Sequence, residues 1–566
     1  MAGPPSHGRH AIQPPSRRTI AQAYTTLPLA DFVDSLLHGL LLLSLALTLG
    51  GVAWALWELR AWRHEVPRTL VHRCLALLGA GALVLAFCQA AVLALRMRLL
   101  ADSLGPGAVG SFLSTTQCLA GAARIALALG VGAAVWWLVR QPARRARWVT
   151  LTALASLLAA SGGWMTHGAG RLDSPALLMA LTVLHQVGAA VWVGGLIQLA
   201  SAWLVARHDP RVGSAWPELV GRFSKLAMIS VLVMVAAAAP LAWIYAGSLA
   251  GLMGTAYGSL ILIKSMLLGA ALLLAAFNFV AARSHDRQPP SPALRTRLPY
   301  LVEAEVIVVV MILFTAAALS DQPPSVDLPA SYQATAREVA EVFRPKLPSL
   351  RTPSLEAMRE EHLRPDGAER SADAYLWSNF SHNVSGLILL VMGVVALVGV
   401  LRQAAWERYW PLGFVAMAAF VYLRAAANDG VWPFGPTRVT ALDTEAMQHF
   451  LAAFLVLALG VFEWRARSAG FRRILWRCVF PALAMAGGVL LLTHSHTSFE
   501  AKPSFLVQVT HTTIGALAGV MAAARWLELR LPSPAGRIAG VVAAGAMIAI
   551  ALVLVFYREA NVVVSG

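Results

Sequence analysis

Uninterrupted apolar runs of about twenty residues recur along this chain, and they constrain its fold more than any other feature. An α-helix of that length crosses a bilayer, where only helices and closed barrels satisfy every backbone hydrogen-bonding group. Of the 566 residues, 58% are hydrophobic and only 13% are charged. The chain is therefore predicted to fold as an all-α, polytopic bundle of transmembrane helices.

About fourteen segments have the length and hydropathy of a spanning helix. They lie at about 31–57, 74–95, 111–139, 148–165, 176–203, 223–247, 258–282, 299–320, 380–401, 409–427, 445–464, 473–493, 504–525 and 536–557. Four regions follow from them. We expect a disordered, proline-rich tail over 1–25, an eight-helix membrane domain over 26–325, a loop or small helical cap over 326–379 and a six-helix membrane domain over 380–566.

The charge distribution predicts which way the helices run. A formal net charge of +16 would suggest nucleic acid in a soluble protein, but here lysine and arginine concentrate in every second loop between helices. Basic loops resist translocation and stay on the cytoplasmic side. Both termini and the loop over 326–379 are therefore expected on the opposite, outer side. The four cysteines form no close pair, so neither a disulfide framework nor a thiolate metal site is predicted.

Histidines gather on that predicted outer side. Eight fall in the outer halves of helices or just beyond them: His38, His167, His185, His382, His449, His494, His496 and His511. A polar group inside the hydrocarbon costs a few kcal/mol unless it is paired or functional. Any one of these histidines can equally serve helix packing, but eight on one side favour a metal site. Imidazole suits copper, zinc, iron and nickel.

One group of these residues lies in the first half of the chain. Asp34 and His38 are one helical turn apart on the same face, and a carboxylate in that place can fix the tautomer of a ligating imidazole. His185 lies about ten residues into its own helix, in or near the same layer. Met165 precedes His167 by two positions, and copper(I) accepts its thioether sulfur. These residues form the first candidate metal site.

A second group lies in the second half. His494 and His496 end one helix, and His511 follows about two turns into the returning helix, so a helical hairpin can bring the three imidazoles together. His382 and His449 enter their helices at similar depth, and either can complete the set. The alternative is that these are scattered interfacial histidines.

Several motifs resemble the core domain of the copper resistance D family over about 180–325. In order they are a histidine before Trp192, Gly194 and Gly195; the sequence "RFS" opening a helix at Arg222; Gly258 and Lys264; Asn278; and a proline pair at 323–324. Upstream, Gly121 and Arg124 resemble the third helix of that family. The second half, with "WSNFSHNVSG" and "LLLTHSH", resembles the carboxy-terminal extension of its longer members.

The resemblance implies a multi-pass protein of the bacterial inner membrane that binds copper at its periplasmic face. A small periplasmic copper-binding protein is the implied partner, and import or resistance is the implied role. His185 is then expected as a copper ligand or relay, with Trp192 packed beside it. Arg124, Lys264 and Asn278 are polar groups within the membrane. An internal ion pair, or hydrogen bonds to carbonyl groups, is expected for Arg124 and Lys264, since a cation would repel copper.

Two other functions stay open. A haem-binding electron carrier also uses buried histidines, although the helices offer none near the inner face. A docking protein for copper delivery or assembly, without transport, fits the one-sided histidines as well as a transporter does. The sequence contains no hydrolytic triad, phosphate loop or catalytic carboxylate pair, so an enzyme is not expected.

Overall fold

A computed structural model describes residues 17–59, 67–141, 144–171, 173–283, 292–362, 371–402, 405–438, 444–468, 474–493 and 502–559. Within these residues thirteen helices are long and apolar enough to cross a membrane, and the helix Val479–Thr493 is a shorter apolar one. The described residues contain no β-strand beyond one isolated bridge between Val431 and Thr437. The predicted fold class is confirmed: the chain is an all-α, multi-pass membrane protein.

The first half of the chain builds ten helices around a shared core. They are α1 (Arg17–Ala53), α2 (Arg68–Leu104), α3 (Gly107–Leu113), α4 (Thr116–Arg140), α5 (Arg145–Ser161), α6 (Pro175–Ala206), α7 (Pro210–Ala246), α8 (Leu249–Gly254), α9 (Ala256–Arg283) and α10 (Pro292–Asp321). A π-helical turn (Trp54–Glu58) extends α1, and two 3₁₀ turns (Gly162–Met165 and His167–Gly170) link α5 to α6. Several helices begin at a side-chain cap. The Thr115 side chain accepts a hydrogen bond from the Cys118 backbone N–H at the start of α4, and the Ser248 side chain accepts one from the Gly251 backbone N–H at the start of α8.

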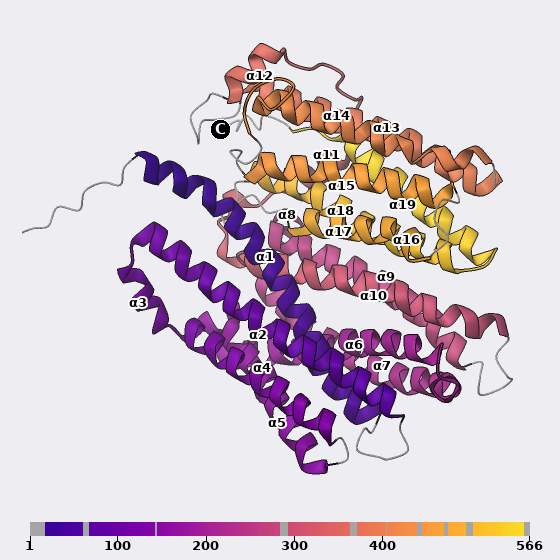
Figure 1. The fold of residues 1–566 in the computed structure, drawn as a ribbon. Helices are drawn as coiled ribbons and strands as arrows, with labels where there is room; N and C mark the ends of the chain where they lie inside the picture. The colour runs from indigo at the N-terminus through magenta and orange to yellow at the C-terminus, as the bar shows by residue number, and fades with distance from the viewer. Residues whose placement is uncertain are drawn as a thin grey trace, which may run out of the picture.

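The second half stacks beside the first (Figure 1). It contains α11 (Ala336–Phe343), α12 (Leu355–His362), α13 (Ala372–Arg402), α14 (Leu412–Asp429), α15 (Thr444–Arg467), α16 (Ile474–Arg477), α17 (Val479–Thr493), α18 (Lys502–Arg530) and α19 (Ala535–Phe556). Short 3₁₀ turns lie at Ser325–Asp327, Ala330–Tyr332 and Ala405–Tyr409. Helix α10 packs against both α17 and α18, and one hydrophobic core runs through both halves.

Two segments differ from the expected boundaries. Helix α1 begins at Arg17, so residues 17–25 are helical rather than part of the expected tail. These residues contain no proline, and a helical backbone satisfies its own hydrogen bonds in water as well as in lipid. For the same reason α13 begins at Ala372, within the expected loop. The segment before α13 contains α11 and α12.

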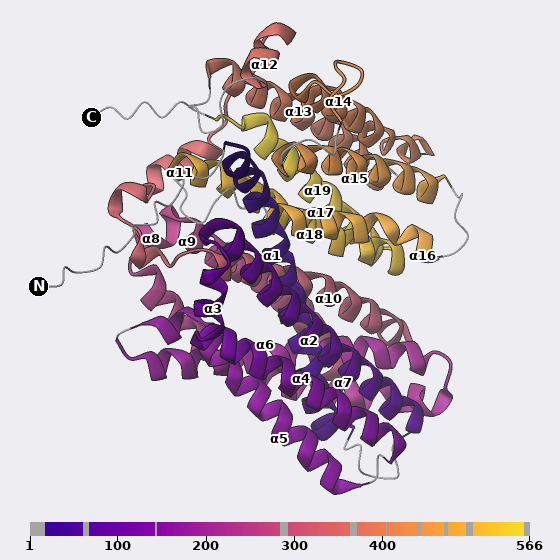
Figure 2. The same ribbon diagram turned by 60° about the vertical axis from the view of Figure 1, so that its left-hand side comes forward.

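The two ends of the bundle differ in character (Figures 1 and 2). At one end lie α3, α8, α11 and α12, together with the last residue of α10, Asp321; we call it the cap end. At the other end α4, α13, α15 and α18 finish on arginines, namely Arg140, Arg402, Arg467 and Arg530; we call it the arginine end. Consecutive spanning helices therefore alternate in direction between a cap-end start and an arginine-end start.

Helices α1 and α6 approach until their backbones touch. A methyl group added at Gly194 would lie 1.9 Å from the Ala46 carbonyl oxygen, and one added at Gly50 would lie 2.4 Å from that of Ala190. Small residues permit this kind of approach between membrane helices. Beside the contact, the Trp192 side chain is 2% exposed. Gly194 thus brings α6 against α1, the helix that carries Asp34 and His38.

Candidate metal centre

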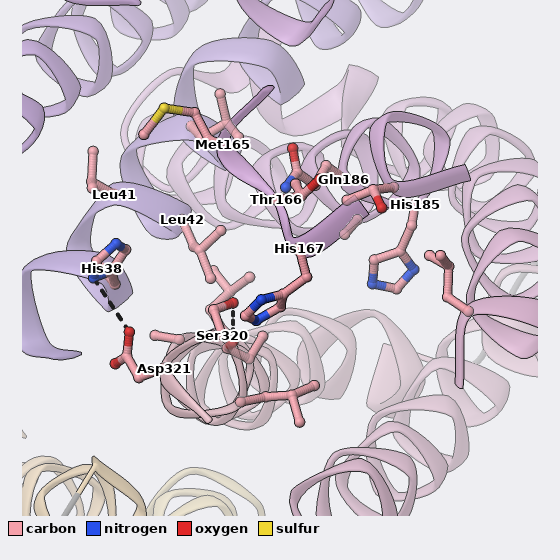
Figure 3. Close-up of a pocket in the computed structure, with 18 of the residues that line it drawn as sticks. His38, Leu41, Leu42, Met165, Thr166, His167, His185, Gln186, Ser320 and Asp321 are labelled. Atoms are coloured by element: carbon pink, nitrogen blue, oxygen red, sulfur yellow. Dashed lines mark hydrogen bonds and ion pairs between the residues drawn. The ribbon is translucent and has the colours of Figure 1, made fainter. Parts of the chain in front are cut away.

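A cavity of about 1450 Å³ lies in the first half of the chain. Side chains of α1, α2, α4, α6, α7, α9 and α10 line it, together with the two 3₁₀ turns before α6. The lining includes eight residues singled out in the sequence: Asp34, His38, Arg124, Met165, His167, His185, Trp192 and Lys264. Figure 3 shows His38 and Asp321 on one side of this cavity, His185 on the other, and His167 between them. The fold thus gathers residues from helices far apart in the sequence around one space.

Asp34, His38 and Asp321 form a cluster that we call the mouth of the cavity. One ligand atom from each of the three lies within 4.8 Å of the others. The His38 Nδ1 atom donates to the Asp34 carbonyl oxygen at 2.9 Å and lies 3.4 Å from Asp34 Oδ2 and 3.7 Å from Asp321 Oδ1. The pairing expected from the spacing of Asp34 and His38 is present, but the better hydrogen bond goes to the backbone of Asp34. The Asp34 carboxylate thus lies beside the His38 imidazole and can serve as a ligand together with His38 and Asp321.

Two further side chains hold the carboxylates of the mouth in place. Arg96 Nη2 donates to Asp34 Oδ2 at 3.3 Å, and Ser35 Oγ donates to Asp321 Oδ2 at 2.5 Å. Two neighbouring carboxylates repel each other, and the Arg96 guanidinium offsets that repulsion. Sequence reasoning missed both Asp321 and Arg96. Each is the first charged residue at the cap end of an apolar run, which is the signal that could have found them.

His167 lies in the 3₁₀ turn between α5 and α6, outside the spanning helices. Its ring meets the Tyr245 ring edge-on, with 6.4 Å between centroids, and forms a hydrogen bond to the backbone of Ser320. Burial lowers the pKa of His167 below its usual value, more than the Ser320 backbone raises it. The imidazole therefore stays neutral to a lower pH than a free imidazole, and the neutral form is the one that binds a metal.

His185 is engaged at both ring nitrogens. Its Nδ1 atom donates to the Met234 carbonyl oxygen at 3.0 Å, and its Nε2 atom lies 3.3 Å from Lys264 Nζ, which donates to it. The partner of Lys264 is thus an imidazole rather than the carboxylate or carbonyl group that we expected. The role of His185 as a copper ligand stays a prediction. Because Lys264 occupies Nε2, this contact must break before a metal can bind to that nitrogen.

In the second half, the structure brings together two of the five predicted histidines. His382 on α13 and His511 on α18 meet edge-on at 5.8 Å between ring centroids, and Tyr557 stacks on His382 at 4.1 Å. In each imidazole Nδ1 donates to the carbonyl four residues earlier, at 2.8 Å to Ser378 and 3.0 Å to Val507.

The remaining predicted residues are placed differently. His449 meets Trp377, which is five positions before His382 and so points to another side of α13. His494 and His496 lie outside the described residues. The side chain of Asn278, on α9, is also outside what the structure describes. The second metal site therefore stays a prediction.

Comparison with known proteins points to copper. Residues 217–319, which span most of α7 and α10 and all of α8 and α9, match the family model of copper resistance protein D. "Copper transport protein CutJ" of Bacillus subtilis (strain 168) is 31% identical over 140 residues, which are 25% of this chain and 24% of that protein. No solved structure matches the chain. Residues 217–319 thus match the copper resistance protein D model, as the resemblance predicted, and they lie within a longer membrane protein that spans about a quarter of its copper-transport relative.

Proposed function

We propose that this protein binds copper at the mouth of the cavity and takes it from there into the membrane. The observation that carries the proposal is the cluster of Asp34, His38 and Asp321, whose ligand atoms lie within 4.8 Å of one another at the cap end of the cavity. The copper resistance protein D match and the printed name of the Bacillus relative supply the choice of metal. The role is binding and transport, without a chemical transformation.

The ligands favour the oxidised ion. Two carboxylates and one imidazole are harder ligands than thiolate or thioether, so the mouth suits copper(II) better than copper(I). Met165, the sulfur ligand that copper(I) accepts, lines the same cavity on the side away from Asp321 (Figure 3). We therefore propose copper(II) as the form that binds first.

The cap end is, in this proposal, the periplasmic side of a bacterial inner membrane. The arginines that close α4, α13, α15 and α18 support a cytoplasmic position for the opposite end. Both chain termini would then be periplasmic. A soluble periplasmic copper-binding protein is the proposed source of the ion, because the mouth faces that side.

Metal analysis of the purified full-length protein tests the proposal. After removal of metal and titration with copper(II), the wild-type protein should retain about one copper per chain at the mouth, and the His38→Ala, Asp321→Asn double variant should lose it. His208→Ala is the matched control, because His208 is exposed near the arginine end of α6. Equal copper retention in all three proteins would show that the mouth is not the binding site.

Uptake into vesicles tests the transport step separately. Proteoliposomes loaded with a copper-sensitive dye should show copper entry that the His38→Ala, Asp321→Asn variant abolishes. Binding without uptake would reduce the function to copper capture at the membrane surface.

A further inference from the structure

The cavity that begins at the mouth ends among hydrogen-bond donors. Gln89, Arg124, Gln186 and Lys264 line it within the membrane-spanning segments, and we call these four residues the deep end. Arg124 and Lys264 each lie eight residues, or about 12 Å, beyond the cap-end start of their helices. The mouth carries two carboxylates, whereas the deep end carries two cations. A bare copper ion would be attracted to the first and repelled by the second.

Arg124 is the most unusual member of this group. Its side chain is 7% exposed, and its Nε atom has no hydrogen-bond partner. Among the described residues no carboxylate forms an ion pair with it. A buried, unpaired guanidinium costs folding free energy. The fold therefore retains this charge although it lowers the stability of the protein. Such a cost is expected where the charged group binds a ligand.

The neighbours of Arg124 are also short of acceptors. Gln89 is 2% exposed, and its Nε2 amide has no partner within the described structure. Within the described residues the polar partner of Lys264 Nζ is the His185 imidazole, at 3.3 Å. A methyl group added at Gly162 would lie 2.5 Å from Gln186 Oε1 and 3.6 Å from Arg124 Nη1, so both side chains border the same glycine, while Lys264 contacts the adjacent residue of α6, His185. Donors from α2, α4 and α9 thus line the same cavity as Gln186 of α6.

We propose that the deep end binds a small molecule bearing an oxyanion, either a carboxylate or a phosphate. The guanidinium fork of Arg124 matches such a group in a bidentate geometry, and Lys264 and Gln89 add donors to its remaining oxygens. The cavity volume of about 1450 Å³ exceeds what a single metal ion needs and accommodates an organic anion. The inference goes beyond copper binding, because it depends only on the donors and the space at the deep end.

The oxyanion has two possible sources, and the experiment separates them. A soluble carboxylate is represented by citrate, titrated calorimetrically into metal-free, full-length protein in nanodiscs of phosphatidylcholine. A lipid headgroup is represented by phosphatidylglycerol, mixed into the nanodiscs without citrate and quantified as lipid retained on the protein after extraction. Absence of metal makes both results independent of whether the mouth binds copper.

The variants follow from the contacts. Arg124→Met and Lys264→Met should each weaken citrate binding, or phosphatidylglycerol retention, by about tenfold or more, because each removes a charge-assisted hydrogen bond. Arg124→Lys keeps the charge but loses the bidentate fork, so it should bind more weakly than the wild type and more tightly than Arg124→Met. Arg140→Met is the matched control on the same helix, since Arg140 is exposed at the arginine end, over the Trp136 ring.

Binding in either arm that depends on Arg124 and Lys264 but not on Arg140 supports the proposal and identifies the source. No binding in either arm, or the same binding in all variants, overturns it and leaves the two cations as structural groups. If Arg124→Met fails to fold, the binding measured with Lys264→Met alone tests whether the oxyanion binds at the deep end.

Discussion

Buried cations at the arginine end of the bundle and at the deep end of the cavity have opposite surroundings. At the arginine end, Arg467 and Arg525 share the fully buried Glu463, with N–O distances of 2.6 and 2.8 Å, and Glu528 adds a contact of 2.8 Å to Arg525. At the deep end of the cavity, Arg124 has no carboxylate partner within the described part of the chain. A charge that serves the architecture is thus folded together with its counter-charge. A charge without one is better explained by something that binds.

The largest effect is expected from a substitution that breaks the ion-pair group at the arginine end. Glu463→Gln should lower the free energy of unfolding by about 3–5 kcal/mol, because it leaves the buried Arg467 without its closest carboxylate. Thermal unfolding of the protein in detergent measures the loss. Glu218→Gln, in the exposed pair with Arg222, is the control and should cost less than about 1 kcal/mol.

Arg124→Met should behave in the opposite way in the same assay. Removing an unpaired buried charge is expected to leave the unfolding temperature unchanged or to raise it. A loss as large as that of Glu463→Gln would mean that Arg124 has a structural partner, and the contrast between the two ends would disappear.

At the mouth a cation is paired with a carboxylate and also lies at a candidate binding site: Arg96 pairs with Asp34 beside the candidate metal ligands. Arg96→Met should weaken copper(II) binding about 10–100-fold, because Asp34 then loses the group that orients its carboxylate. Competition with a chelator of known affinity measures the change. Arg98→Met, two residues further along α2 and well exposed, should bind copper like the wild type.

A smaller effect depends on pH and on His167. Its pKa is lowered in the folded protein, so the unfolded chain takes up the proton more readily, and stability should fall as the pH drops below about 6.5 toward the folded pKa. In His167→Gln this part of the loss should vanish, so its unfolding temperature should decrease less between pH 7.5 and 5.5. Parallel decreases in both proteins would show that His167 titrates normally.

The smallest effect concerns a partly exposed ion pair at the cap end. Lys502 Nζ lies 2.5 Å from Glu338 Oε1, and Glu338 also caps α11 through Thr335. Burial raises the pKa of Glu338, but its hydrogen bonds to Lys502 and Thr335 together lower it by more, so the pKa lies below its usual value. Glu338→Gln should therefore cost about 1 kcal/mol or less, measured as faster proteolysis of the cap segment at neutral pH. The difference from wild type should shrink in acid, where the carboxylate is protonated.

The apolar runs predicted the helices well, because the bilayer allows the backbone few alternatives. The spacing of Asp34 and His38 likewise predicted a real contact, since it depends only on the helical repeat. Their partner Asp321 comes from a helix 283 positions or more away, and no local pattern reveals which helices become neighbours. The contact between His185 and Lys264 was missed for the same reason.

The helix ends were predicted less well than the helix centres. Hydropathy falls where α1 and α13 leave the hydrocarbon, yet both helices continue, because water does not forbid a helical backbone. The pairing of His382 with His511 also depends on how α13 packs relative to α18, which composition does not encode.

The glycine contact between α1 and α6 has a consequence for how the cavity opens. With the Gly194 backbone against the Ala46 carbonyl group, these helices cannot slide along each other without first separating. The distance between His38 on α1 and Gln186 on α6 is therefore expected to stay constant. We expect any opening or closing of the cavity to come from its other walls, α9 and α10, moving against this fixed pair.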